Sequence, residues 1–276
     1  MATTMECPAR CSGVNKMRPK TRSPIKDKPL RLPGQSVAEQ RLKLIDDVTE
    51  GPILLAVFLV LLAGFEWWRD YTGMKINPVL FSFAAGLSVS YAAFRIWRAL
   101  PKLRALRQAA EGEQAVGQFL ERLREGGFHV FHDVIGVGFN VDHVLIGPAG
   151  IFTVETKTWS KPSTGNAQIN FDGKSIKVGS FEPDRDPVTQ AKGQAGWLKA
   201  ILAESTGRTF DVRPVILFPG RFIDNPGGHF EDVWVLEPKA LPAFLGNEPA
   251  RLAPEDIKLM SFHLSRLIRS SERAKS

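Results

Sequence analysis

The chain has 276 residues, enough for one sizeable core with additional segments, and its net charge at pH 7 is +7. That charge is unevenly distributed. Residues 1–43 hold ten Lys and Arg residues against three acidic ones, whereas residues 108–276 hold 19 basic and 21 acidic residues. Because the C-terminal region is slightly acidic, the overall charge does not indicate nucleic-acid binding. The basic residues are more typical of the flanks of a membrane segment.

The first 34 residues are rich in basic residues and poor in apolar ones, which predicts a disordered tail. Cys7 and Cys11 lie in this tail with no histidine nearby. Two thiols alone cannot complete a tetrahedral zinc site, so we interpret them as thiols of a reducing compartment with no role in a metal site. We expect residues 1–50 as a whole to form a basic, largely disordered cytoplasmic tail.

Two apolar segments follow, and they predict a transmembrane helical hairpin within residues 51–98, with lipid contact at residues 52–68 and 78–97. Each segment is close to the lower limit of about 17 residues for crossing a bilayer. Tryptophans at their ends and basic residues beyond both outer flanks are typical of membrane interfaces. A pair of buried core helices is the alternative. A signal peptide is excluded because its apolar region would not begin after about fifty polar residues.

The charges around the hairpin predict its orientation. Ten basic residues precede it and five follow it between Arg95 and Arg107, whereas the loop of residues 66–77 has only Arg69 and Lys75. Because basic residues favour the cytoplasmic side, both termini are expected inside the cell. The sequence therefore predicts a multi-pass protein of the inner (plasma) membrane, with residues 99–276 in the cytoplasm.

The stretch NVDHVLIGPAGIFTVETK, residues 140–157, predicts two neighbouring strands joined by the GPAG turn. A symmetric turn would set Asp142 opposite Glu155, with their Cβ atoms about 5 Å apart. Because side chains alternate along a strand, Glu155 and Lys157 share one face. A register shift of one residue would move Asp142 to the other face.

Two carboxylates at this spacing suit one Mg²⁺, whose oxygen ligands lie at about 2.0–2.1 Å. An acid, a second acid and a lysine two residues later form the PD-(D/E)xK arrangement of metal-dependent nucleases. The same three residues, Asp142, Glu155 and Lys157, are equally consistent with a solvated strand face that carries an ion pair.

The surrounding residues resemble the nuclease-related domain (NERD) family of the PD-(D/E)xK superfamily. The resemblance covers roughly residues 108–222 and is carried by three segments: GEQAVG at 112–117, the strand pair above, and DPVTQAKGQAGWL at 186–198. It implies a restriction-endonuclease-like core that cleaves DNA with Mg²⁺, or with Mn²⁺ in its place. The positions that match the motifs of the family are Glu113, Asp142, Glu155, Lys157 and Gln190.

Residues 99–276 as a whole predict an α/β fold with a mixed central sheet flanked by helices. Asp186 is expected to cap a helix that Pro187 opens and Gly207 ends. Residues 223–276 are expected as a C-terminal extension. Expected helices cover residues 103–125, 187–206 and 255–270, and expected strands cover residues 128–134, 214–218 and 233–236, with a second hairpin in residues 167–178.

Two further residues need an explanation. On the helix expected over residues 103–125, Glu113 falls at the edge of the apolar face. A carboxylate there is costly without a partner, which a metal ion or its water shell would supply. A first-turn acid paired with an arginine explains it equally well. His143 alternates away from Asp142 and is interpreted as structural.

From these residues and the resemblance we expect a membrane-anchored nuclease that hydrolyses DNA phosphodiester bonds. Asp142 and Glu155 would hold Mg²⁺, and Glu113 would complete the metal shell directly or through water. Lys157 would orient the attacking water and offset charge on the phosphate, and Gln190 would hydrogen-bond either group. The alternative is a non-catalytic, membrane-tethered DNA-binding or assembly module on the same fold.

Overall fold

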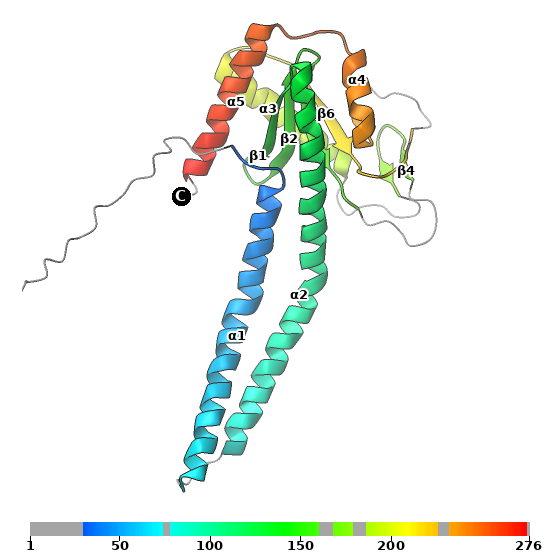
Figure 1. Ribbon diagram of the computed structural model, residues 1–276. Coiled ribbons are helices and arrows are strands. Elements are labelled where there is room, and N and C mark those ends of the chain that lie inside the picture. The colour runs from blue at the N-terminus through cyan, green and yellow to red at the C-terminus, as the bar shows by residue number, and fades with distance from the viewer. Residues whose placement is uncertain (1–29, 74–77, 160–167, 179–185, 226–231, 275–276) are drawn as a thin grey trace, which may run out of the picture.

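The computed structural model describes residues 30–73, 78–159, 168–178, 186–225 and 232–274. It consists of a long helical hairpin that carries a mixed α/β head at one end (Figure 1). The expected α/β class, with a mixed sheet preceded by two long apolar helices, is confirmed. The cysteines of the N-terminal segment lie outside the described residues.

The hairpin is formed by α1 (Gln35–Tyr71) and α2 (Pro78–Leu120), and a 3₁₀ turn, η1 (Glu121–Gly126), ends the second helix. The helix expected at residues 103–125 is therefore the upper half of α2, continuous with the apolar segment. The expected domain boundary at residues 98 and 99 falls inside this helix. Pro101, the only helix breaker near the boundary, does not end it.

The expected tail of residues 1–50 also differs from the structure at its C-terminal end. Residues 30–34 are packed onto the head, and α1 begins at Gln35. Low apolar content led to the expectation of disorder, but buried ion pairs and close contacts of Pro33 and Gly34 with α2 hold this segment instead. Residues 1–29 lie outside the described part of the chain.

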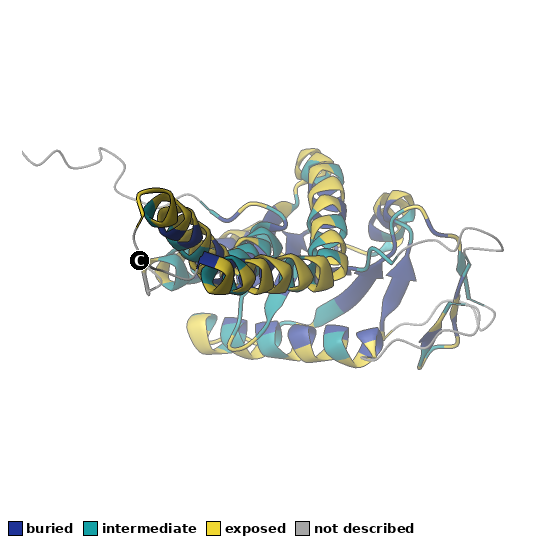
Figure 2. Ribbon diagram, turned by 90° about the horizontal axis from the view of Figure 1, so that it is seen from below, coloured by how far each residue is buried: buried dark blue, intermediate teal, exposed yellow. Residues whose placement is uncertain are grey.

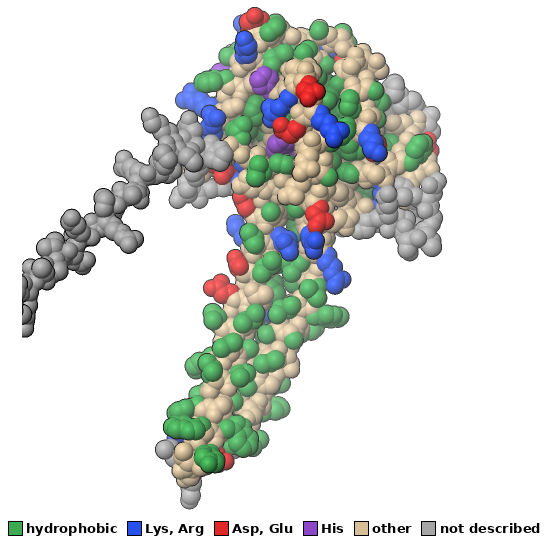
Figure 3. Space-filling model, viewed as in Figure 1, with side chains coloured by type: hydrophobic (Ala, Val, Ile, Leu, Met, Phe, Trp, Pro, Cys, Tyr) green, Lys and Arg blue, Asp and Glu red, His purple; other side chains and the backbone are tan. Residues whose placement is uncertain are grey.

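The apolar stretches of the hairpin are exposed rather than buried in the head. Only 22% of the α1 apolar window and 17% of the α2 window are buried, so these are not core helices of the α/β domain. Much of the hairpin is exposed (Figure 2). Apolar side chains cover most of its lower part, and most of its charged side chains lie above them, nearer the head (Figure 3). Both helices are long and apolar enough to cross a membrane. Small residues let them pack closely, namely Ala56, Ala63, Ala85, Ser88 and Ala92.

The head is built on a five-stranded sheet with the order β1-β2-β3-β6-β8. The first three strands form an antiparallel meander, and β6 and β8 add parallel to β3. A smaller sheet with the order β5-β4-β7 contains the second expected hairpin. The strands are β1 (His129–Ile135), β2 (Asn140–Gly147), β3 (Gly150–Thr156), β4 (Ile169–Phe171), β5 (Ile176–Lys177), β6 (Val212–Leu217), β7 (Ile223–Asp224) and β8 (Trp234–Leu236).

Helices cover both faces of the large sheet (Figure 1). The end of α2 and α4 (Leu241–Asn247), which follows η2 (Pro238–Ala240), pack on one face through Val116, Leu120 and Leu241. On the other face lie α3 (Pro187–Thr206) and α5 (Pro254–Ala274). The inner stripe of α5 is formed by Ile257, Met260, Leu264 and Ile268, whereas Leu267 is only partly buried.

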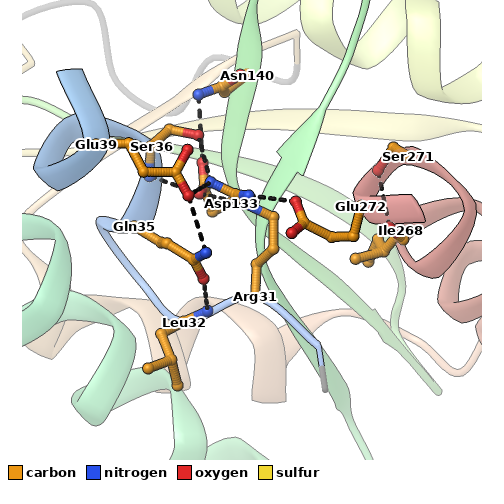
Figure 4. Close-up of polar contacts among 10 residues, drawn as sticks. All are labelled: Arg31, Leu32, Gln35, Ser36, Glu39, Asp133, Asn140, Ile268, Ser271 and Glu272. Atoms are coloured by element: carbon orange, nitrogen blue, oxygen red, sulfur yellow. Dashed lines mark hydrogen bonds and ion pairs between the residues drawn. The ribbon is translucent and has the colours of Figure 1, made fainter. Parts of the chain in front are cut away.

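Arg31 ties the start of the hairpin to the head (Figure 4). Its side chain is 1% exposed and its Nε donates to Asp133 Oδ2 at 2.7 Å. It also pairs with Glu39 at 3.1 Å and with Glu272 of α5. We call these four residues the Arg31 cluster. Burial favours a neutral guanidine, but the three surrounding carboxylates raise the Arg31 pKa above its ordinary value.

Asp133 is held in an unusual backbone conformation by this cluster. Its φ of 50° lies in the left-handed region, and the β1–β2 pairs stop at His132 and resume at Val134. Its carboxylate accepts from the Ser36 amide at 2.7 Å and from Asn140 Nδ2 at 3.3 Å. These contacts stabilise a conformation that L-residues rarely adopt.

Candidate active site

The β2–β3 hairpin has the register that the turn predicted, as far as the observed pairs extend. These pairs run from Gly147 opposite Gly150 to His143 opposite Val154, one residue short of Asp142 and Glu155. Glu155 points to the α3 face, where it contacts Gln190 and Gln194. The Asp142 carboxylate lies at the end of β3, where it accepts from the amide of the residue after Glu155, and the direct opposition of the two acids stays a prediction.

Glu155 is the most densely hydrogen-bonded group of this face. Its Oε1 accepts from Lys157 Nζ at 2.6 Å and from Gln190 Nε2 at 2.7 Å. Its Oε2 accepts from Gln194 Nε2 at 2.6 Å. Gln190 Oε1 also accepts from Lys157 Nζ at 3.0 Å. Three of the residues expected in the site, Glu155, Lys157 and Gln190, are therefore in direct contact.

The start of α3 fixes where its two glutamines lie. The Asp186 side chain caps the helix by accepting from the amides of Val188 and Thr189, at 3.0 and 3.1 Å. Pro187 occupies the first turn and Gly207 ends the helix with a φ of 69°, as expected. Gln190 and Gln194, four residues apart, then share the face that contacts Glu155.

Gln194 is a site residue that sequence reasoning did not select. It is buried, and its Nε2 bonds both Glu155 and the Asn140 carbonyl, at 2.9 Å for the latter. Its only sequence signal is the three-to-four spacing with Gln190 and Trp197 along the helix, which apolar packing produces equally often. The contact to Asn140 links the site to the end of β2 that borders the Arg31 cluster.

Asp142 and Glu113 are the least compensated acids of the site. Asp142 Oδ2 accepts from the Thr156 amide at 2.7 Å. Burial, reinforced by the charges of Glu155 and Glu113, raises the pKa of Asp142 well above its usual value. Burial likewise raises the pKa of Glu113 to about 8, with repulsion from Asp133 and Glu155 adding to the effect. These acids therefore lie within electrostatic reach of one another.

The position of Glu113 decides between its two sequence explanations. It lies far inside α2 rather than in a first turn, and its side chain makes no hydrogen bond or ion pair with any described residue. It is only 7% exposed. An arginine partner is therefore not the reason for this buried acid, at least within the described ranges.

Glycines bring α2 against the end of β3. A Cβ on Gly112 would lie 1.9 Å from Thr158 Cγ2, and one on Gly117 would lie 2.6 Å from Pro33. Gln108 Nε2 also donates to the Thr158 carbonyl at 2.9 Å. The two glycines of the GEQAVG segment thus allow α2 to approach both the strand end and the Arg31 segment, which places Glu113 between them.

Residues 108–219 match the family model of the nuclease-related domain (NERD). These residues, less than half of the chain, are similar to nuclease-related domains. The match includes Glu113, Asp142, Glu155, Lys157 and Gln190, and it agrees with the core expected at residues 108–222. No curated protein and no solved structure matches the chain.

The oxygen donors of the nuclease-related domain fit a hard divalent cation, but only in part. Among the described residues, no three His, Cys, Asp or Glu side chains are grouped closely enough to hold a metal ion by themselves. Mg²⁺ commonly uses only one or two carboxylates and keeps several waters, so a complete protein cage is not required. The poorly paired carboxylates of half-buried Asp142 and buried Glu113 are suitable donors, whereas both oxygens of Glu155 already accept hydrogen bonds.

Two of the three histidines of the sheet, His132 and His143, contact each other on the face that α2 covers. His143 is fully buried, and its Nδ1 is 2.9 Å from His132 Nδ1. His132 Nε2 in turn lies 2.8 Å from Glu121 Oε1. Burial lowers the pKa of both histidines, so the pair is neutral at pH 7. These contacts support the interpretation of His143 as a structural residue.

Proposed function

We propose that this protein is a membrane-anchored, Mg²⁺-dependent nuclease that hydrolyses DNA phosphodiester bonds. The observation that carries the proposal is the contact of Glu155 with both Lys157 and Gln190, with the Asp142 carboxylate hydrogen-bonded to the amide of the next residue, Thr156. This constellation lies inside a nuclease-related domain. An ordinary solvated strand face would not bury Glu155 to 4% exposure and surround it with two glutamines from another element.

The acids and the lysine have different roles in this proposal. Asp142 and Glu155 would hold Mg²⁺ or Mn²⁺, with Glu113 as a direct or water-mediated ligand. The bound ion supplies Lewis-acid activation of the phosphate and lowers the pKa of a water ligand. Lys157 Nζ, held by Glu155 and Gln190, places a positive charge where negative charge grows on the phosphate.

Gln190 positions Lys157 and Glu155 and does not itself react. Its amide oxygen accepts from Lys157 while its amide nitrogen donates to Glu155, so one side chain fixes the relative positions of the base and the acid. Gln194 adds a bond from the buried side of Glu155. Rigid placement of this kind avoids reorganisation during the reaction.

The proposed location is the inner membrane, with residues 52–68 and 78–97 as spans and both termini in the cytoplasm. Support comes from the exposed apolar faces of the two helices and from the basic residues on both outer flanks. Because α2 runs without a break from the second span to Glu113, the membrane would fix the orientation of the site.

Cleavage of plasmid and linear DNA by purified full-length protein in detergent tests the proposal. We expect cleavage with Mg²⁺ or Mn²⁺, none in EDTA, and none with Glu155→Gln. The matched control is Glu204→Gln, which removes an exposed acid from the far part of α3. Equal cleavage by Glu155→Gln and the parent protein would assign the activity to a contaminant.

The non-catalytic alternative has two observations in its favour. Glu155 is fully hydrogen-bonded and no three-ligand group exists among the described residues, which suits a domain that binds DNA without cutting it. DNA binding that persists in the parent protein, together with no cleavage under any divalent ion, would establish that alternative over the nuclease.

A further inference from the structure

We propose that a basic groove along α5 binds the sugar–phosphate backbone of a single-stranded nucleic acid, at a place separate from the acidic site. The groove is a hollow of about 660 Å³ between α5 and the start of β1. We call it the α5 groove. Its lining includes Lys258, Ser261, Phe262, Arg266, Arg269 and Arg273.

The cations form one continuous stripe on the helix. Four basic residues and one aromatic residue recur every three or four positions, so they share one face of α5. They are Lys258, Phe262, Arg266, Arg269 and Arg273. Fifteen residues of helix extend over about 22 Å. That length can follow several phosphates, which are spaced by about 3.4 Å along each strand of B-DNA. Lysine and arginine side chains are visible on the α5 side of the head in Figure 3.

Two cations of the stripe, Lys258 and Arg266, are not neutralised by acidic groups of the described residues. No Asp or Glu is among the described residues that line the groove. Asp256 of the same helix pairs with Arg208, and Glu272 pairs with Arg31. Lys258 and Arg266 form no ion pair within the described ranges. Their charges are therefore available to a ligand.

Two side chains that line the groove have hydrogen-bond donors without partners. Ser261 is 5% exposed, and its Oγ has no hydrogen-bond partner among the described residues. The Nε of Arg269 is also buried without a partner there. A buried hydroxyl and a guanidinium N–H without partners cost free energy, and rotation of either side chain toward the groove would let it donate to a phosphate oxygen.

Phe262 indicates unpaired bases rather than a duplex. Its side chain is 63% exposed in the middle of the cationic stripe. Single-stranded nucleic acids are bound by basic grooves in which aromatic side chains stack on bases, whereas the bases of a duplex are not accessible for stacking. We therefore expect a single strand, or a frayed end, to bind more tightly than a duplex.

Other occupants are less consistent with the structure. Residues 1–29 of the chain hold seven Lys and Arg against Glu6 and Asp27, so a basic groove would repel them. Anionic lipid is distant, because the charged part of α1 before the first apolar span, residues 35–51, adds about 25 Å of helix. In physiological salt, the attraction between exposed charges falls off over about 8 Å, so lipid head groups would attract the groove only weakly. The choice of nucleic acid as the polyanion rests on the proposed function.

Fluorescence anisotropy with full-length protein in uncharged detergent tests the groove. The probe is a labelled 20-nucleotide single strand, compared with a duplex of equal length, in EDTA so that cleavage cannot occur. Lys258→Ala/Arg266→Ala should weaken binding and reduce the slope of log K against log salt by about 1.4, since each neutralised phosphate contributes about 0.7. The matched control is Lys174→Ala/Lys239→Ala, which removes two exposed lysines elsewhere.

A second variant separates stacking from charge. Phe262→Ala should weaken single-strand binding roughly tenfold and leave duplex binding nearly unchanged. Equal affinity and equal slope for the Lys258/Arg266 variant and its control would overturn the proposal. Loss of binding to phosphatidylserine vesicles, with DNA binding unchanged, would assign the groove to lipid instead.

The groove and the nuclease can fail independently. Binding in EDTA is measured without turnover, so a catalytically silent domain with a groove-dependent salt slope would keep the groove and reject the nuclease. Cleavage that is lost with Glu155→Gln but insensitive to the groove variants, at all salt concentrations, would keep the nuclease and reject the groove.

Discussion

Two clusters bury carboxylates at the same end of the large sheet, and they are satisfied very differently. In the Arg31 cluster, Asp133 accepts from a guanidinium, a backbone amide and an asparagine. In the acidic site, Glu113 has no partner among the described residues, and Asp142 has one backbone amide. One lysine, Lys157, faces three acids there.

The difference separates a structural role from a functional one. Buried charges that are paired and hydrogen-bonded hold elements together, and here they join the start of α1, the sheet and α5. Acids that lack compensation reduce stability, and burial together with their mutual repulsion raises the pKa of Glu113 and of Asp142. Acids kept at that cost are typical of sites that receive a cation.

Removal of Arg31 should have the largest effect on stability. Arg31→Met leaves Asp133 buried without its cation, so we expect the free energy of unfolding to fall by about 3–5 kcal/mol. Thermal unfolding of the full-length protein in detergent measures this loss. Adding Asp133→Asn in the same chain should restore part of the stability, since the uncompensated charge is removed. If Arg31→Met lowered the free energy of unfolding by less than a control substitution at an exposed residue, the Arg31 cluster would not be a buried structural contact.

Asp142→Asn should reduce activity without reducing stability, in contrast to Arg31→Met. We expect DNA cleavage to fall by about 10²–10³, comparable to the loss of one preorganised transition-state contact. The melting temperature in EDTA should hold or rise, because one of several crowded carboxylates is neutralised. A marked decrease in melting temperature, with cleavage reduced only in proportion to the folded fraction, would make Asp142 a structural residue like Asp133.

Gly112→Ala tests the close packing of α2 against the end of β3. This helix separates the two clusters. The new Cβ would meet Thr158 at 1.9 Å and push the helix from the end of β3. Overpacking of this kind costs about 1–3 kcal/mol, and displacement of Glu113 should also reduce cleavage. Gly196→Ala on α3 meets nothing within 4 Å and is the matched control, with unchanged or slightly higher stability. Equal effects of both substitutions would contradict the close packing.

The pH dependence of stability should show the smallest effect. The Glu113 pKa is about 8 in the folded protein, above the ordinary 4.5, so the folded state binds more protons between these values. Stability contributed by protonated Glu113 is therefore lost as pH rises from 4.5 through 8. In EDTA, Glu113→Gln should exceed the parent protein in melting temperature at pH 9, and the gap should close by pH 5. A gap that is independent of pH would show that Glu113 is not buried as a carboxylic acid.

Part of the acidic site was accessible from sequence because some of its signals are local. The GPAG turn predicted the β2–β3 register as far as His143 and Val154, and the capping residue Asp186 and the glycine after α3 predicted the ends of that helix. Gln190 and Glu113 were selected from the resemblance to the family, because no local pattern shows that Gln190 contacts Glu155 across 35 residues.

The Arg31 cluster was not accessible in this way. Arg31 lies 102 residues from Asp133 and 241 from Glu272, and it occurs in a segment whose composition predicts disorder. Nothing local distinguishes it from the other basic residues of the tail. The α5 groove was hidden for a related reason, because the balanced charge of residues 108–276 averages a basic stripe with acids that are paired elsewhere.

Direct titration of Mn²⁺ into full-length protein tests the central claim, that the acidic site and not the Arg31 cluster receives a cation. Electron paramagnetic resonance of free Mn²⁺ counts the bound ions without any need for turnover. We predict one bound ion per chain, lost in Asp142→Asn and retained in Glu272→Gln, which neutralises an acid of the Arg31 cluster. Absence of binding in the parent protein, or equal binding in both variants, would contradict the account.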